Sequence, residues 1–482
     1  MIVIGGGLAG LSSAVALAEA GFRVRLLEKR PHLGGRAASY ILPGGEHIDN
    51  CQHVTLGCCT NLEDFYRRVG AENQIRFFNR LVFAAPDGRR GTIAASALPP
   101  PLHMALSFAF FPLLGFADKR AIARALLAIT RSGGSPADLA GNGAGMTMLA
   151  WLEKHRQTPR AIHRFWEVIL VSALDEQLDR IDARYGIDVF WKAFLSTRGG
   201  YRLGIPRVPL GDLYEGCRKS LAQRGGEVHL RAGARGFLIV DARVEGVERE
   251  DGSVETADYY LAAVPQDILP ELLPPEVVEK EPVFLNLRNL CASPITGVHL
   301  WFDRTVMTEP FLTLLDSTTQ WVFNKTQLCG VGAEQAENGE QYLQLVISAS
   351  YGLSTRSRQD IIALCLNELR DVLPATRDAK LVKGTVVKEM SATFSPAPGS
   401  DRWRPAQKSP IAALFLAGDW TSTGWPSTME GAVRSGYLAA EAILSDAGMP
   451  RKFLQPDLLP EGLARLWTRK TKLTSANGSE RK

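Results

Sequence analysis

The sequence predicts an α/β protein built around a parallel sheet, and three features of residues 1–28 support this prediction. Residues 2–4 are a short apolar run, which is typical of a buried parallel strand. A turn containing Gly5, Gly7 and Gly10 follows and leads into an alanine-rich helix over residues 11–20. A second strand over residues 22–27 then ends at an acidic residue, Glu28. Strand, glycine turn, helix, strand and acid together predict a dinucleotide site.

Each glycine in this turn has a distinct physical role. Gly5 allows the sharp turn out of the strand, Gly7 lets a pyrophosphate approach the helix N-terminus, and Gly10 lets the helix pack on the sheet. Glu28 is placed to accept hydrogen bonds from a ribose diol at about the ~20-residue distance expected. The remaining predicted cofactor contacts of this unit are Leu8, Ala9 and Lys29.

Length and composition limit the other possibilities. A chain of 482 residues is too long for one compact core and predicts two or three lobes. The net charge of +4 is too small to indicate a nucleic acid partner. Seven cysteines, an odd number without regular spacing, indicate reduced thiols and no metal site. With a first strand at residue 2 there is no room for a signal peptide, so we expect a cytoplasmic protein.

A second glycine turn lies directly behind the first unit. The turn contains Gly34, Gly35 and Arg36, whose amides and guanidinium can grip a diphosphate or lie under a flavin. With the first glycine turn and Glu28, it resembles the flavin amine oxidase and phytoene desaturase superfamily, whose members bind FAD. The resemblance implies a discontinuous Rossmann-like FAD-binding domain and an α+β substrate domain.

The superfamily carries further FAD segments, and the chain has sequences similar to them. Residues 414–420 and 424–433 resemble the C-terminal FAD segment. The resemblance implies that Gly418 and Asp419 face the ribityl–pyrophosphate and that Thr428 and Met429 meet the flavin ring. It also implies that Val228, on a predicted strand, contacts the adenine.

These segments divide the chain into interleaved parts. Residues 1–50, 205–280 and 400–450 are expected to form the FAD-binding domain, and residues 51–204 and 281–399 the substrate domain. Residues 451–482 form a basic tail with eight basic and three acidic residues. This tail either contacts a membrane surface or is a solvated end.

Residues 91–117 contain no acidic residue, lysine or arginine. Three consecutive prolines and Pro112 argue against a membrane-spanning helix. The run therefore forms ordinary core, lines an apolar tunnel, or dips into the surface of a bilayer.

Several local sequences more specifically resemble the hydroxysqualene dehydroxylases of bacterial hopanoid biosynthesis. They are residues 49–54, 57–61, 157–160, 164–166, 171–174, 204–206 and 208–210, with Cys51 where a small residue such as glycine is expected. This resemblance implies replacement of the allylic hydroxyl of hydroxysqualene by hydrogen, which gives squalene. The expected partners are this long apolar isoprenoid and an electron donor, either NADPH or a separate reductase, with peripheral contact at the inner face of the membrane.

Removal of a hydroxyl requires an acid, because hydroxide is a poor leaving group. His53 is the first candidate, since imidazole titrates near neutral pH, with Asp49 orienting or assisting it. His53 is equally consistent with a structural role. Asp175, Glu176 and Asp179 are weaker candidates, because a cluster of charges at a helix end is usually solvated.

Two other functional classes remain open. The first is oxidation on the same fold, by a polyene desaturase or an amine oxidase. Thr428 stands where amine oxidases typically place an aromatic side chain, which weakens the amine alternative. The second is a non-catalytic, flavin-stabilised protein that escorts a lipid.

Overall fold

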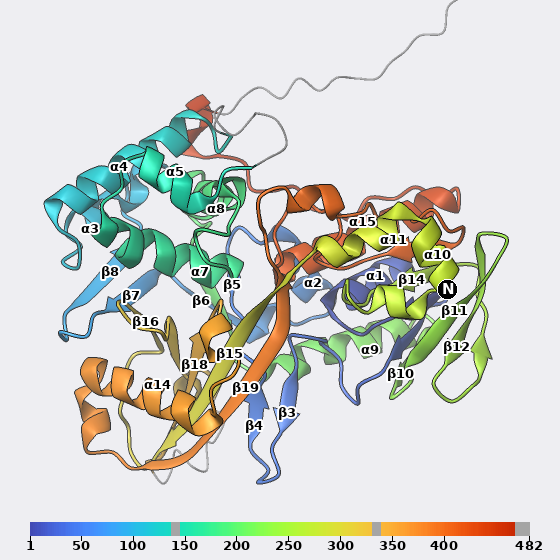
Figure 1. Ribbon diagram of the computed structural model, residues 1–482, viewed down its shortest axis with the longest axis horizontal. Coiled ribbons are helices and arrows are strands. Elements are labelled where there is room, and N and C mark those ends of the chain that lie inside the picture. The colour runs from blue at the N-terminus through green and yellow to red at the C-terminus, as the bar shows by residue number, and fades with distance from the viewer. Residues whose placement is uncertain (136–144, 330–338, 468–482) are drawn as a thin grey trace, which may run out of the picture.

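The computed structural model describes residues 1–135, 145–329 and 339–467, and a five-stranded parallel sheet is at the centre of one half (Figure 1). The strand order is β10-β2-β1-β14-β20. The strands are β10 (Glu227–Leu230), β2 (Arg25–Glu28), β1 (Ile2–Ile4), β14 (Tyr260–Ala262) and β20 (Leu414–Leu416). The sheet thus draws on three separated stretches of sequence, which confirms the predicted fold class. The domain limits remain a prediction.

Both faces of this sheet are buried, as parallel sheets require. Val3, Leu26, Leu261 and Phe415 form a core with α1 (Leu8–Glu19), α9 (Glu215–Ala222) and α15 (Met429–Asp446). The intervening strand residues point to the opposite face. There they pack against β11 (Ala234–Val240), β12 (Arg243–Arg249), α10 (Pro275–Lys280) and α11 (Pro282–Leu285). A short strand, β13 (Val254–Glu255), closes the charged hairpin on β12.

The other half contains a seven-stranded mixed sheet with the order β19-β15-β18-β17-β16-β7-β8. Its strands are β19 (Leu381–Phe394), β15 (Ala292–Phe302), β18 (Gln341–Ile347), β17 (Trp321–Asn324), β16 (Phe311–Leu314), β7 (Arg80–Ala84) and β8 (Arg90–Ala94). Helix α14 (Arg358–Val372) packs on one face. A helical layer packs on the other face, so the sheet lies between two apolar cores (Figure 1).

The helical layer includes α3 (Ala105–Ala109), α4 (Phe116–Arg131), α5 (Met148–Lys154), α6 (Pro159–Ala161), α7 (Val168–Leu174) and α8 (Ala183–Val189). The sequence pattern over residues 159–178 predicts one long helix, and the chain is helical over most of that range, from Pro159 to Leu174. A π-helical segment (Ile162–Glu167) separates α6 from α7, and α7 ends at Asp175, which has a left-handed backbone with φ 51°. The turn at Asp175 directs the chain away from the helix axis.

Two small sheets join the halves. One pairs β3 (Ser39–Ile41) with β4 (His47–Asp49), and the other pairs β9 (Leu203–Pro206) with β5 (Thr55–Leu56) and β6 (Ile75–Phe78). Helix α2 (Thr60–Arg68) packs against α15. Within the three described ranges, no helix has the length and apolar character needed to cross a membrane.

Candidate active site

The N-terminus of α1 forms a cradle that contains no side-chain cap. Gly7 is the N-cap residue, no side chain bonds to the free amides, and the first turn carries no acidic residue. A Cβ on Gly10 would lie 2.0 Å from the carbonyl oxygen of Gly5, so only glycine allows this close packing. Gly5 has φ +105°, and a Cβ there would lie 2.4 Å from the Ala263 oxygen. A bare, rigid helix N-terminus of this kind suits a pyrophosphate.

Glu28 lies at the end of β2 and is buried. Its Oε2 accepts a hydrogen bond from the Gly6 amide at 2.6 Å, and its Oε1 accepts one from the Arg30 amide at 2.7 Å. The carboxylate is therefore fixed beside the glycine turn. Lys29 forms a surface ion pair with Glu250 at 3.0 Å. Val228 lies on β10, with its Cα opposite that of Leu26 on β2.

The second glycine turn packs directly on the first. The Gly34 amide donates to the Gly6 carbonyl at 2.8 Å, and a Cβ on Gly35 would lie 3.0 Å from the Gly7 Cα. Gly34 has φ +106° and Gly35 has φ +60°, conformations that favour glycine. Beyond this turn, the Arg36 guanidinium forms an ion pair with Asp419 and donates to the Ala392 carbonyl at 2.8 Å. Arg36 thus joins three segments that are distant in sequence.

The C-terminal segment completes this cluster. The Gly418 amide donates to Ser435 Oγ on α15 at 2.9 Å, and the buried Asp419 accepts a hydrogen bond from Ser427. Thr428 caps α15, since its hydroxyl accepts from the Gly431 amide at 3.0 Å, and Met429 is the first helical residue.

A buried arginine that the sequence analysis did not identify holds the loop between β20 and α15. The Arg404 guanidinium donates to the carbonyls of Asp419, Thr421 and Trp425 at 3.0, 2.7 and 2.7 Å.

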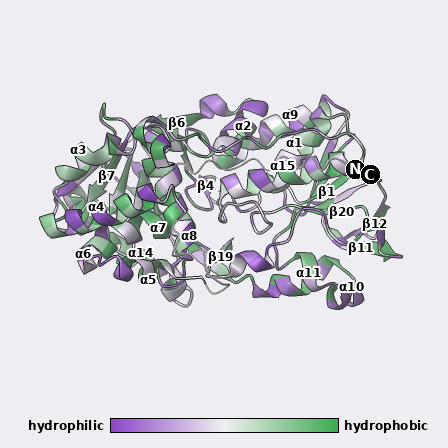
Figure 2. Cartoon of the chain, turned by 90° about the horizontal axis from the view of Figure 1, so that it is seen from above, coloured by the Kyte–Doolittle hydropathy of each residue, from purple (hydrophilic) through white to green (hydrophobic). Residues whose placement is uncertain are grey.

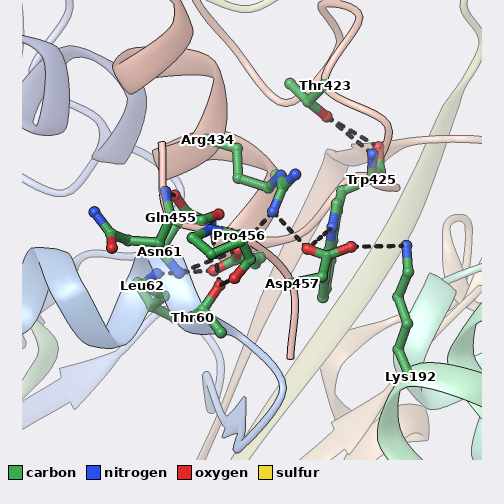
Figure 3. Close-up of polar contacts among 12 residues, drawn as sticks. Thr60, Asn61, Leu62, Lys192, Thr423, Trp425, Arg434, Gln455, Pro456 and Asp457 are labelled. Carbon is green, nitrogen blue, oxygen red and sulfur yellow. Dashed lines mark hydrogen bonds and ion pairs between the residues drawn. The ribbon is translucent and has the colours of Figure 1, made fainter. Parts of the chain in front are cut away.

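A network of polar contacts fixes the chain that follows α15 (Figure 3). Asp457 accepts hydrogen bonds from Arg434 at 2.8 Å and from the Trp425 indole at 3.3 Å, and it lies 3.6 Å from the Lys192 ammonium. Asn61 and the Gln455 backbone bond to each other in both directions. Residues 453–467 therefore strap the two halves together. In the part of this tail that the structure describes, Phe453 and Ala464 are buried whereas Leu459 and Leu466 are exposed; residues 468–482 lie outside the described residues.

Asp49 and Lys325 form a buried ion pair at the junction of the halves. Each is only 2% exposed, and Lys325 Nζ lies 2.9 Å from Asp49 Oδ2. Burial alone would raise the pKa of Asp49, but Lys325, the Leu210 amide and the Ser39 hydroxyl lower it below its usual value. Gln52 also accepts from Lys325, at 2.9 Å. Asp49 is thus held as a carboxylate and is no proton donor near neutral pH.

His53 lies close to this pair and is held by a backbone contact. Burial lowers the pKa of His53, so the imidazole is neutral at neutral pH. Its Nδ1 lies 3.0 Å from the Cys51 carbonyl oxygen, which can only accept, so Nδ1 carries the hydrogen. The remaining nitrogen, Nε2, is then an acceptor. This geometry suits positioning or proton acceptance better than proton donation.

Asp175 is a buried carboxyl at the same junction, and Glu176 beside it is also buried. The expectation that this charge cluster is solvated is therefore wrong for both residues. Asp175 Oδ1 accepts from the Ala349 amide at 2.7 Å, and Oδ2 lies 2.9 Å from the Thr393 hydroxyl. Burial raises the pKa of Asp175 to about 8. Glu176 accepts from the Tyr351 hydroxyl at 2.7 Å.

The end of β19 connects Asp175 to the glycine turns. Thr393 contacts Asp175, the preceding carbonyl of Ala392 accepts from Arg36, and the following amide of Phe394 donates to Ser427 at 3.3 Å. Asp175 is also close enough to Cys51 that, after burial, its charge contributes to raising the pKa of that thiol to about 12. A carboxyl that is protonated near neutral pH therefore lies one strand residue away from the Arg36–Asp419 cluster.

Comparison with known proteins identifies the family. The flavin-containing amine oxidoreductase family matches residues 8–444. The chain belongs to this family. The matched residues include Gly10 of the first glycine turn, the second glycine turn and the Arg36–Asp419 cluster. Among the residues that the structure describes, no group of three or more His, Cys, Asp or Glu is arranged to hold a metal ion.

Curated relatives of this chain include carotenoid desaturases. It is 28% identical to a 15-cis-phytoene desaturase of Solanum lycopersicum, covering 92% of this chain and 78% of the relative. It is 27% identical to the 15-cis-phytoene desaturase of Synechococcus elongatus, covering 92% and 95%. A probable zeta-carotene desaturase of the same organism is 28% identical, with coverage of 92% and 98%.

Solved structures share the fold. An oxidoreductase from Methanosarcina mazei matches with a TM-score of 0.71 and 19% identity, covering 92% of this chain and 99% of that one. A putrescine oxidase matches with a TM-score of 0.68 and 15% identity, covering 92% and 98%.

Family and fold together confirm that the cofactor is FAD and that the protein is a flavin-dependent oxidoreductase. The bare α1 N-terminus, the paired glycine turns and the fixed Glu28 carboxylate suit this cofactor.

Proposed function

We propose that this flavin-dependent oxidoreductase reductively removes the allylic hydroxyl of hydroxysqualene and gives squalene. The observation that carries the proposal is the buried Asp175 carboxyl, which bonds to Thr393 beside the Arg36–Asp419 cluster and whose pKa burial raises to about 8. Loss of a hydroxyl consumes a proton, whereas desaturation releases one. The local sequences similar to the hydroxysqualene dehydroxylases support the same substrate.

The overall reaction balances with one proton donor. Reduced FAD, when bound, supplies a hydride, which is the chemistry of the cofactor itself. Asp175 donates its proton to the hydroxyl oxygen, the allylic C–O bond breaks, and water leaves. A C–H bond replaces the C–O bond at the allylic carbon, so the substrate is reduced by two electrons.

Other residues of the chain keep the site dry and ordered. Cys51 belongs to one apolar cluster that also contains Phe83, Phe165 and Tyr201, and this cluster excludes water that would capture an allylic cation. The Asp49–Lys325 pair fixes the segment that carries Cys51 and His53, and His53 positions the substrate oxygen through Nε2.

The proposal includes the cofactor contacts and the domain division. Residues 1–50, 205–280 and 400–450 hold FAD, while residues 51–204 and 281–399 hold the substrate. Gly5, Gly7, Leu8, Ala9 and Gly10 are the proposed cofactor-binding residues of the first glycine turn, where Gly7 lets the pyrophosphate approach the backbone. The other proposed FAD contacts are Glu28, Gly34, Gly35, Arg36, Val228, Gly418, Asp419, Thr428 and Met429. Lys29 is the remaining proposed FAD contact, and its ammonium also forms a surface ion pair with Glu250. The electron donor is NADPH or a separate reductase.

A single-turnover experiment tests the proposal. The FAD-loaded protein is reduced without oxygen, mixed with hydroxysqualene, and analysed for squalene by mass spectrometry while the flavin absorbance is followed. We expect one squalene for each flavin reoxidised. Binding of hydroxysqualene without flavin reoxidation or squalene formation would instead favour a lipid escort.

Polyene desaturation is the second candidate function, because the relatives named above are phytoene and zeta-carotene desaturases. In that case the oxidised protein would be bleached by phytoene, and the product would carry an additional double bond. Bleaching by an amine would favour an amine oxidase. Neither oxidation would produce squalene from the reduced protein.

A further inference from the structure

The outer end of the helical layer exposes large apolar side chains. Phe110, after α3, is 82% exposed, and Phe116, at the start of α4, is 83% exposed. Leu106 on α3 is 51% exposed, and Leu102 is also exposed. Helix α3 carries no charged residue (Figure 2). Clustered exposure of this kind marks a surface that contacts a partner or a membrane.

The C-terminal residues 462–467 extend this surface. The Ala464 amide donates to the Pro100 carbonyl at 3.0 Å, which places the short 3-10 helix Gly462–Trp467 beside residues 98–102. Leu463 and Leu466 on this helix are exposed. Lys119 Nζ on α4 donates to the Ala109 carbonyl at 2.7 Å and joins α4 to α3. We call the exposed set the apolar face; its members are Leu102, Leu106, Phe110, Phe116, Leu463 and Leu466.

The charge beside the apolar face is positive. Arg120, Arg124 and Arg131 are exposed on α4, and the first two form no ion pair with any described residue. Asp118 is the only acidic residue between positions 91 and 131, and it is buried. Its carboxylate accepts from the Gly115 amide at 2.9 Å and from the Thr158 hydroxyl at 2.5 Å. Glu461, which is exposed beside the 3-10 helix, accepts from the Arg198 amide at 3.0 Å. Apolar side chains beside exposed arginines fit an anionic lipid surface.

The interior beneath the apolar face is a single apolar cluster. Phe111, Leu113 and Ile122 lie under α3 and α4 and belong to the same apolar cluster as Cys51. Phe108 and Met104, both partly buried, pack against this cluster. The apolar face therefore lies over an apolar interior that reaches the segment carrying Cys51.

We propose that the apolar face docks the protein on the surface of an anionic lipid bilayer. Phe110 and Phe116 enter the boundary between headgroups and acyl chains, and Arg120 and Arg124 contact lipid phosphates. Of the three alternatives that the sequence left open for residues 91–117, this is contact with a bilayer surface. Docking brings the protein to the bilayer, where the proposed lipid substrate dissolves, but the docking and its test do not depend on that substrate.

Vesicle flotation with the FAD-loaded full chain tests the docking. The vesicles are phosphatidylcholine alone, or phosphatidylcholine with phosphatidylglycerol, each at low and high salt. We expect binding to the anionic vesicles, weakened by salt. The variant F110S/F116S should bind at least about tenfold more weakly to both. The variant R120Q/R124Q should lose about tenfold on anionic vesicles only. The control L238S/V240S removes exposed apolar side chains on β11 and should bind as wild type does.

Three results would overturn the proposal. The first is absence of wild-type binding to anionic vesicles. The second is binding that F110S/F116S leaves unchanged although its flavin absorbance and melting temperature match wild type. The third is self-association, measured by sedimentation, that F110S/F116S abolishes without any vesicle binding, which would assign the face to a second copy of the chain. Squalene formation from detergent-dispersed hydroxysqualene is measured separately, so failure of the proposed function is distinguishable from failure of the docking.

Discussion

Replacing Asp175 with asparagine removes the proposed proton donor and keeps the shape of the side chain. The amide oxygen can still accept from the Ala349 amide, and the amide nitrogen can donate to the Thr393 hydroxyl. General acid catalysis typically contributes about 10²- to 10⁴-fold to a rate. We therefore expect D175N to lower the single-turnover rate of squalene formation by that factor, with FAD still bound.

The pH dependence follows from the pKa of about 8 that burial gives Asp175. At pH 7 roughly nine-tenths of the molecules then carry the proton, and at pH 9 roughly one-tenth do. The wild-type rate should fall about tenfold for each pH unit above 8, while D175N should have no such decline. Glu176 and Cys51 are ionisable groups whose charges interact with that of Asp175. Stopped-flow measurement of flavin reoxidation, without oxygen, records the profile.

The same substitution has a second readout in stability. The folded pKa of Asp175 is raised above its usual 3.8, so its contribution to stability is fully present below about pH 4. That contribution is lost as the pH rises towards 8, by at most about 1.4 kcal/mol per pH unit. Urea unfolding of D175N should therefore depend less on pH than that of wild type. If D175N keeps the wild-type rate and the wild-type decline above pH 8, Asp175 is not the donor.

Three further substitutions test the site. K325M leaves the Asp49 carboxylate buried without its partner and should lower the free energy of unfolding by about 3–5 kcal/mol. The double variant K325M/D49N should recover most of that free energy. Urea unfolding measures both. G10A places a Cβ 2.0 Å from the Gly5 carbonyl oxygen and should yield protein without flavin absorbance. Retention of FAD by G10A would contradict this reasoning. The control is G352A, because a Cβ at Gly352 has open space around it. H53Q should keep the rate decline above pH 8, since His53 is already neutral there; loss of that decline would return the donor role to His53.

The fold class and the cofactor could be predicted because the signals in the first unit are local. Strand, glycine turn, helix, strand and Glu28 are all contained in 28 residues, and the spacing alone indicates the ligand. The side chains that join distant segments gave no such signal. Lys325 meets Asp49 across 276 residues of sequence, and Arg404 is buried among loop carbonyls. An isolated lysine or arginine in a sequence is almost always exposed, so neither could be identified before the fold was known.

The burial of Asp175 likewise could not be predicted from the sequence. A charged residue after a helix is usually solvated, and only the positions of Ala349 and Thr393 make this one buried. The uncharged residues 91–117 were a better signal of an apolar region, because the absence of charge is visible in the sequence. Which of its side chains are exposed depends on the turn between α3 and α4, where Phe111 and Leu113 point inward while Phe110 and Phe116 point outward.

The order of the strands in the parallel sheet also bears on biosynthesis. β20 forms the edge beside β14, and α15 packs on α1, so the first helix to be translated is covered by the last long one. The nascent chain therefore leaves the ribosome with the β1–α1 unit incompletely buried until about residue 446 has been made. FAD can be enclosed only after that point. We accordingly expect apoprotein made under riboflavin starvation to depend on chaperones more than the flavin-replete protein does.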